Sequence, residues 1–266
     1  MKKKRVFLAV LGVFTLFGTL GANAGSVLIT YAENPGVQTS TLSNTSYITF
    51  DNLPNPDGSL AWTGVGTYDN VAVINANRYG GAEGTGKYLV QSTSVPSGGA
   101  VPTTTLTLNT PSAYFGLWWS AGDAANRLTF YNGSNLVADF TTSTLVNVLP
   151  ASYKGNPTPT FLGQNSGEKY AFFNVYGNST TTWDRIVFSN INSSGFESDN
   201  HTTRVAAWGQ QPGEAGPEPG VPVMRVSGTE VSTNLVAVPE TSSWVMGLLA
   251  LGAVVFMVRR SAKSSV

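Results

Sequence analysis

Short runs of alternating or continuously apolar residues recur through the middle of the chain, each bounded by Gly, Pro or Asn. Alternation with a period of two is typical of a β-strand with one buried face, and helix-forming residues are scarce here. We therefore predict eleven strands, at residues 27–31, 47–50, 70–75, 87–91, 103–109, 113–120, 127–131, 136–140, 170–176, 185–188 and 201–207.

Four of these runs and the turn between two of them carry the clearest structural information. Leu106 and Leu108 alternate with Thr, as on a half-buried strand, whereas residues 114–119 are nearly all apolar, as on a strand buried on both faces. Asn132-Gly133 separates two strand-like runs and favours a tight hairpin turn. Many short strands without a convincing helix predict an all-β domain, a β-sandwich of jelly-roll-like type, with a barrel as the alternative.

The N-terminal residues have the features of a secretory signal peptide. Lys2, Lys3, Lys4 and Arg5 precede an apolar run at residues 6–20, and Ala22-Asn23-Ala24 is a small-x-small cleavage site. We expect residues 1–24 to be removed by signal peptidase, so that the exported chain begins at Gly25.

The composition changes after Trp208. Residues 209–223 contain four prolines and four glycines, which predicts a linker that runs to residue 237. The predicted β-sandwich ectodomain is therefore residues 25–208. Residues 242–258 then form an apolar segment just long enough, at about 1.5 Å per helical residue, to approach the roughly 30 Å hydrocarbon core of a membrane. Trp244 suits one interface and Arg259-Arg260 the cytoplasmic side, which predicts a transmembrane helix.

Val238-Pro239-Glu240, the apolar segment and Arg259-Arg260 at the end of the chain together resemble the PEP-CTERM sorting signal of Gram-negative bacteria. Thr241 stands where that family has proline. The resemblance implies a sorting signal at residues 238–266, a membrane protease of the exosortase type as processing partner, transient anchoring in the inner membrane, and release to the cell surface or extracellular matrix. Residues 114–142 and 195–206 also resemble uncharacterised exosortase-dependent surface proteins, a family without an assigned catalytic activity.

Charge narrows the range of partners. Seven of the 15 Lys and Arg residues lie in the two tails, so residues 25–238 carry eight basic and 14 acidic residues, a net charge of −6. Nucleic-acid binding needs clustered cations, so we expect no nucleic-acid partner. The chain has no cysteine, which excludes disulfides, thiolate zinc sites and a cysteine nucleophile.

Glu197 and Asp199 are the most suggestive polar residues, because side chains two apart on a strand face the same side. With Asn200 they could bind Ca²⁺, or act as a glycosidase pair, or lie in a solvated turn. Asp123, in a predicted loop between two strands, is a further candidate ligand residue. The single histidine, His201, is expected to be structural, since no nucleophile-elbow motif accompanies it.

Trp118 and Trp119 are candidates for stacking on sugar rings, although core packing of both is the favoured interpretation. Because they are adjacent, they must point to opposite sides of a strand. The sequence thus predicts a non-enzymatic surface or matrix protein that acts by structural or binding interaction with exopolysaccharide or the cell surface. A carbohydrate-binding module and a polysaccharide hydrolase are the two alternatives.

Overall fold

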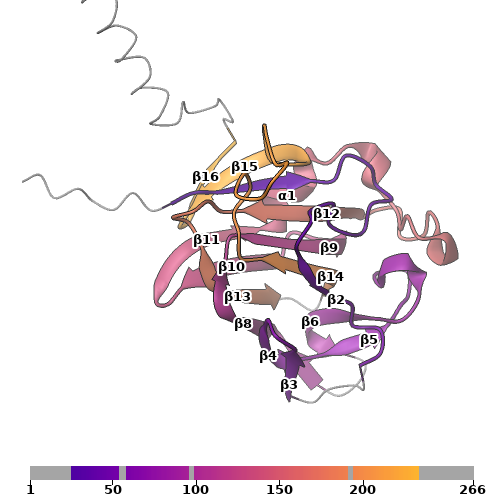
Figure 1. The fold of residues 1–266 in the computed structure, drawn as a ribbon. Helices are drawn as coiled ribbons and strands as arrows, with labels where there is room; N and C mark the ends of the chain where they lie inside the picture. Colours follow the sequence, from indigo (N-terminus) through magenta and orange to yellow (C-terminus); the bar gives the residue numbers. More distant parts are fainter. Residues whose placement is uncertain (1–24, 54–57, 96–98, 191–193, 234–266) are drawn as a thin grey trace, which may run out of the picture.

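The computed structural model describes residues 25–53, 58–95, 99–190 and 194–233. The described part of the chain is all-β, as predicted, and its strands form two antiparallel sheets (Figure 1). A short helix, α1 (Thr142–Val148), follows a strand of the smaller sheet. The regular structure of these residues also includes the single 3-10 turns η1 (Ala82–Gly84), η2 (Ala151–Tyr153) and η3 (Pro159–Phe161).

The larger sheet follows the order β16-β15-β1-β12-β9-β14-β6-β5, with β2 also paired to β14 and β7 to β6. Its strands are β1 (Val27–Tyr31), β2 (Ser46–Ile48), β5 (Val73–Asn75), β6 (Lys87–Val95), β7 (Gly99–Val101), β9 (Tyr114–Gly122), β12 (Lys169–Tyr176), β14 (Phe196–Arg204), β15 (Val221–Ser227) and β16 (Glu230–Ser232).

The smaller sheet follows the order β11-β10-β13-β8-β4-β3. Its strands are β3 (Gly58–Trp62), β4 (Gly66–Val71), β8 (Thr103–Ser112), β10 (Asn126–Asn132), β11 (Asn135–Thr141) and β13 (Trp183–Asn190).

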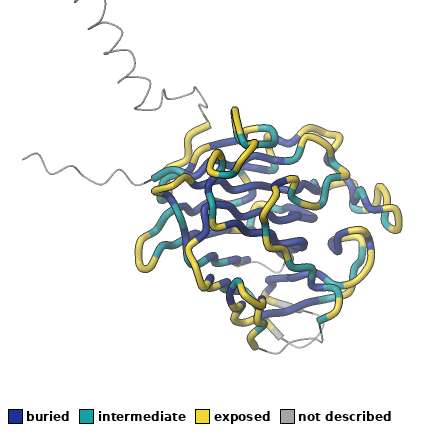
Figure 2. Tube along the Cα trace, in the orientation of Figure 1, coloured by how far each residue is buried: buried dark blue, intermediate teal, exposed yellow. Residues whose placement is uncertain are grey.

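The main core lies between the two sheets. Phe115 of β9 packs its ring 6.2 Å from that of Phe130 on β10 and 5.9 Å from that of Phe188 on β13, so aromatic contacts join the sheets. Aromatic pairs at these separations add to the free energy gained by burying apolar area. Figure 2 shows the result as a buried interior with exposure concentrated in loops.

A second buried layer covers the outer face of the larger sheet. Trp118, Tyr170 and Phe172 form one apolar cluster there, and Tyr114 and Tyr176 belong to another. Residues 32–45 and the segment around η1 pack over these side chains. Two hydrogen bonds hold them to β14: the side chain of Asn200 donates to the carbonyl oxygen of Gln38, and the N–H of Ala82 donates to the carboxylate of Asp199. Both faces of the central strands are therefore buried.

The strongest sequence patterns agree with the structure. All of β9 is buried, as the apolar run predicted, and Leu106 and Leu108 are buried on β8 with Thr107 exposed between them. The predicted hairpin joins β10 and β11, with Asn132 paired to Asn135 and Gly133 at φ 58°. The turn is displaced by one residue, because Asn132 is the last residue of β10 and Gly133 takes the first of the two loop positions.

Other strands differ from their predictions. The single strand expected at residues 70–75 is two strands in different sheets, β4 and β5, and Asn70 has a positive φ of 57° just before the break. β14 begins at Phe196 and ends at Arg204, whereas the strand was predicted at residues 201–207. The first half of β14 was not predicted, because the residues before His201 are mostly polar and typical of a turn.

The predicted linker is wrong over most of its length. β15 pairs with β1, and Val223, Met224 and Val226 are buried in the main core. Gly220, at φ 98°, precedes β15 where a Cβ would lie 2.5 Å from the hydroxyl oxygen of Thr30, so the close approach of the chain requires glycine. The folded domain therefore extends past Trp208 to include β15 and β16. Most of the prolines and glycines lie in the loop that leads to β15, which packs against the domain.

The signal peptide at residues 1–24 and the sorting signal at residues 238–266 lie outside the described residues. Within the described part, no helix has the length and apolar character needed to cross a membrane.

Candidate functional site

Glu197 and Asp199 lie on the same face of β14, as predicted, paired with Ser120 and Trp118 of β9. Both are buried, with 7% and 1% of their surfaces exposed. The solvated-turn interpretation of these residues is therefore wrong. They lie in the middle of the larger sheet, under the second buried layer.

The carboxylate of Asp199 is held by backbone amides. Its Oδ2 accepts a 2.8 Å hydrogen bond from the N–H of Ala82, and its Oδ1 accepts a 2.7 Å bond from the N–H of Asn200. Burial nevertheless raises the pKa of Asp199 to about 7, against the opposing effect of these donors. Both oxygens face N–H donors, an arrangement that fastens η1 to the sheet rather than presenting free ligands to a cation.

Glu197 lies where β14 begins. Burial raises the pKa of Glu197 well above its ordinary value, and the charges of Asp123 and Glu168 raise it further. Its Oε2 is buried and finds no hydrogen-bond partner in the described part of the chain. Among the described residues, no group of three or more His, Cys, Asp or Glu side chains could hold a metal ion.

The side chains of Asn200 and Asp123 both form hydrogen bonds with the backbone. Asn200 adopts a positive φ of 49° at a register shift of β14, and its Nδ2 donates a 2.9 Å bond to the carbonyl oxygen of Gln38. Asp123 accepts a 2.8 Å bond at Oδ1 from the N–H of Ala125, as is usual for Asp in a turn. The register shift brings Asn200 onto the outer face of the larger sheet, where it lines a small cavity.

The two adjacent tryptophans are both buried, on opposite faces of β9. Trp119 packs in the main core, 4.5 Å from the ring of Phe196, and Trp118 packs in the outer layer against Tyr170. The core-packing interpretation is confirmed for both, so neither offers an exposed platform for a sugar.

His201 is also structural. It is fully buried, its ring stacks 4.9 Å from that of Phe188, and its two nitrogens lie 2.9 Å from the Tyr68 hydroxyl and 3.0 Å from the Ser198 hydroxyl. Burial lowers the pKa of His201 to about 3, so the ring is neutral at physiological pH.

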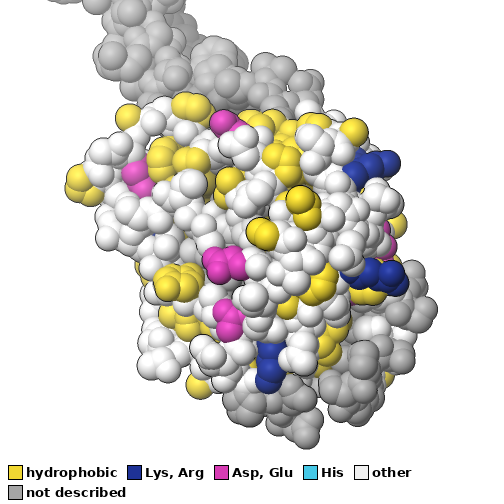
Figure 3. Space-filling model, turned by 90° about the vertical axis from the view of Figure 1, so that its right-hand side faces the viewer, with side chains coloured by type: hydrophobic (Ala, Val, Ile, Leu, Met, Phe, Trp, Pro, Cys, Tyr) yellow, Lys and Arg dark blue, Asp and Glu magenta, His cyan; other side chains and the backbone are white. Residues whose placement is uncertain are grey.

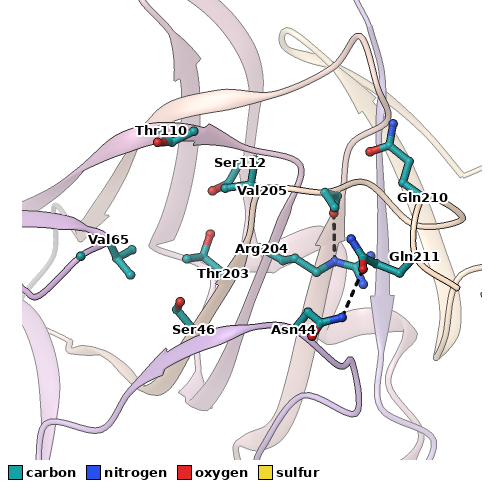
Figure 4. Close-up of a pocket in the computed structure, with 12 residues that line it drawn as sticks. Asn44, Ser46, Val65, Thr110, Ser112, Thr203, Arg204, Val205, Gln210 and Gln211 are labelled. Carbon is teal, nitrogen blue, oxygen red and sulfur yellow. Dashed lines mark hydrogen bonds between the residues drawn. The ribbon is translucent and has the colours of Figure 1, made fainter.

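An open pocket of about 510 Å³ lies between the last residues of β14, β2 and the end of β8 (Figure 4). Figure 4 shows Val65, Thr110, Ser112, Thr203 and Ser46 on one side of it and Asn44, Gln210 and Gln211 on the other. The remaining lining residues are Gly64, Arg204, Val205 and Ala206.

The lining presents hydroxyl and amide groups. The hydroxyls of Ser46 and Thr110 are exposed and form no hydrogen bond within the described residues, so they are available to a ligand, whereas Ser112 has only 2% of its surface exposed. Asn44 donates a 3.2 Å bond to Gln211, which orients both amides across the pocket. The described lining contains no Asp, Glu, His or Lys. Groups of this kind can bind a polar, uncharged ligand, and they supply no acid–base pair for hydrolysis.

The one charged residue of the lining is already paired. Arg204, with 2% of its side chain exposed, forms an ion pair with Glu214, and its Nε donates a 2.9 Å bond to the carbonyl oxygen of Ala206. Although burial raises it, the pKa of Glu214 is held below its ordinary value by bonds from Arg204 and from backbone amides. The same carboxylate accepts from the N–H groups of Gly209 and Gln211, so it shapes the loop that walls the pocket.

The residues that line this pocket were not predicted as functional. Ser and Thr are abundant throughout the chain, so no local signal distinguishes Ser46, Thr110, Ser112 and Thr203 from the others. They meet only because β2, β8 and β14 converge, which depends on pairing between distant segments.

No protein-family model matches the chain, and no curated protein sequence matches it.

Proposed function

We propose that this is an exported surface or matrix protein, processed by an exosortase-type protease, whose β domain binds a neutral polysaccharide. The observation that supports binding is a pocket that presents exposed, unpaired hydroxyls of Ser46 and Thr110 beside the amides of Asn44 and Gln211, and whose one charged residue is already paired. Sugars present hydroxyl groups that match such donors and acceptors. On the face shown in Figure 3, Lys, Arg, Asp and Glu side chains are few and scattered.

The fold and the tail complete the proposal. We infer a jelly-roll-like sandwich, because neighbours such as β1 between β15 and β12 come from distant parts of the chain. Residues 242–258 act as a transmembrane helix, with Arg259 and Arg260 on the cytoplasmic side, and the Val238-Pro239-Glu240 motif directs cleavage.

The export proposal is tested by mass spectrometry of the protein isolated from the producing cells. We expect an N-terminus at Gly25 and a C-terminus near Glu240. Replacing both Arg259 and Arg260 with Ala is expected to reduce the processed form severalfold, because the positive flank that orients the helix is lost. A mature protein of unchanged size and amount from the double variant would contradict the proposed sorting signal.

The binding proposal is tested with the full-length protein in detergent against immobilised maltohexaose, cellohexaose, laminarihexaose and mannohexaose. For a hexasaccharide that binds, the double variant Ser46→Ala, Thr110→Val is expected to lose roughly ten- to thirtyfold in affinity, since each lost hydrogen bond contributes about 1 kcal/mol. Both side chains are exposed, so the stability should not change.

Thr107→Val is the matched control, because Thr107 is an exposed threonine of the same strand outside the pocket. Equal losses in Thr107→Val and in the pocket variant would contradict binding in this pocket, as would the absence of binding to every neutral hexasaccharide.

A further inference from the structure

A smaller cavity of about 190 Å³ lies on the outer face of the larger sheet, beside β2. Its lining is again rich in hydroxyls and contains one amide and one aromatic ring. The lining residues are Thr39, Ser40, Thr45, Tyr47, Asn200 and Thr202. No charged side chain is among them. The hydroxyls of Ser40, Thr45 and Thr202 each form at least one hydrogen bond within the fold, so they offer a ligand only their remaining donor or acceptor capacity.

The two cavities occupy opposite faces of one short ladder. Ser46 pairs with Thr203, and both line the large pocket; Tyr47 pairs with Thr202, and both line the small cavity. Side chains of adjacent strand residues point to opposite faces and their Cα atoms are about 3.3 Å apart along the strand. The two cavities are therefore separated only by the thickness of β2.

β2 is an edge at this position. In the described part of the chain, β2 pairs with β14 and with no second strand. β6 lies along the same side of β14, but it pairs only with the other end of that strand, at Phe196 to Ser198, and so does not cover β2. A chain-like ligand that passes over the free edge of β2 can thus reach both cavities.

Tyr47 marks this edge with an exposed aromatic ring. It is 70% exposed, and its hydroxyl makes no hydrogen bond within the described residues. By contrast, Tyr68, Tyr88, Tyr114, Tyr170 and Tyr176 are essentially buried. A tyrosine ring has an apolar body and a polar tip, and its face can stack on the apolar face of a sugar ring while the hydroxyl remains in water.

The backbone beneath the small cavity is specialised as well. The register shift of β14 between Asp199 and Thr202 places Asn200 at a positive φ of 49°, and Asn200 and Thr202 then both line the cavity. Irregularities of this kind re-aim side chains and are held in place by surrounding structure, here by the bond from Asn200 to Gln38.

We propose that the large pocket, the ring of Tyr47 and the small cavity form one continuous site for an internal stretch of a neutral polysaccharide chain, which crosses the edge of β2. This inference rests on the proposed binding function and adds to it. The ligand is recognised along several sugar units and not at a chain end, and Tyr47 supplies the stacking surface between two hydroxyl-lined subsites.

The test compares a hexasaccharide with the corresponding disaccharide, using the full-length protein and the neutral sugar series that binds best. Tyr47→Ala is expected to weaken hexasaccharide binding about tenfold, because the stacking surface is lost. Disaccharide binding, confined to the large pocket, should change less than twofold. Tyr47→Phe keeps the ring and should retain hexasaccharide affinity within about threefold.

Tyr79→Ala is the matched control, since Tyr79 is another partly exposed tyrosine and lies outside both cavities. It should leave both affinities unchanged. Hexasaccharide binding that survives Tyr47→Ala overturns the continuous site and leaves the proposed function standing. Equal weakening of the disaccharide and the hexasaccharide also overturns it. No binding of any neutral sugar by the unaltered protein overturns the proposed function itself.

Discussion

Between pH 7 and pH 4, the His201→Gln variant is expected to lose about 3 kcal/mol less free energy of unfolding than the unaltered protein. Burial lowers the pKa of His201 from 6.5 to about 3 in the folded protein. The unfolded chain therefore takes up a proton as the pH falls below 6.5, while the folded chain does not. The stability contributed by the neutral ring is complete above pH 6.5 and is lost towards pH 3, by about 1.4 kcal/mol per pH unit.

Two buried carboxyls act in the opposite direction. Because burial raises the pKa of Asp199 to about 7, the folded protein binds a proton that the unfolded chain releases above pH 4. Its contribution to stability is complete at low pH and is lost as the pH rises towards 7, and the raised pKa of Glu197 has the same sign. The pH profile of the unaltered protein therefore mixes opposing effects, and the difference between the two proteins isolates His201.

The measurement is urea unfolding of both full-length proteins at pH 7 and pH 4. His201→Gln loses the stacking on Phe188 and is less stable at pH 7, and the gap should close by about 3 kcal/mol at pH 4. Phe130→Leu, a substitution in the main core that does not touch the ring of His201, should be equally destabilising at both pH values. A His201→Gln profile parallel to that of Phe130→Leu would show that His201 is not held neutral in the fold.

The sequence was most informative where burial follows from local pattern. The apolar run of β9 and the alternation of Leu106 and Leu108 predicted both strands, because the two-residue period reports directly on the two faces of a sheet. The Asn-Gly pair predicted the hairpin of β10 and β11 for an equally local reason, since glycine tolerates a positive φ.

β14 could not be predicted in the same way. Glu197, Asp199 and Asn200 have the composition of a turn, yet they are buried. Their burial depends on residues 32–45 and on η1, which are more than 100 positions away in the sequence and supply the hydrogen bonds that a buried polar group needs. A local pattern carries no information about such a cover, and the candidate pocket escaped prediction for the same reason.

The segment after Trp208 shows the opposite error. Its prolines and glycines were interpreted as a linker, but Val223, Met224 and Val226 of β15 lie in the main core. The loop that leads to β15 is held by the buried pair Arg204–Glu214, which joins residues ten apart, and by the bond from the Trp208 indole to the carbonyl oxygen of Gly216. Proline and glycine are equally suited to a packed loop with several positive φ angles.

Replacing Arg204 with Met is expected to destabilise the protein by about 3–5 kcal/mol, because it leaves the carboxylate of Glu214 buried without its cation. The double variant Arg204→Met, Glu214→Leu removes both charges and should recover most of that loss. Sugar binding should weaken in the double variant even where stability recovers, since the backbone amides of Gly209 and Gln211 then lose the carboxylate that positions the pocket wall.

Arg225→Met is the control for loss of a cation alone. Arg225 is exposed on β15 and has no ion-pair partner among the described residues, so this substitution should cost less than about 1 kcal/mol. The comparison is made by urea unfolding of the four full-length proteins at pH 7. If Arg204→Met costs no more than Arg225→Met, the buried ion pair and the loop that it holds, from Val205 to Gly220, contribute little to the stability of the fold. A large loss with recovery in the double variant would instead establish that the folded domain, and the wall of its pocket, depend on this loop.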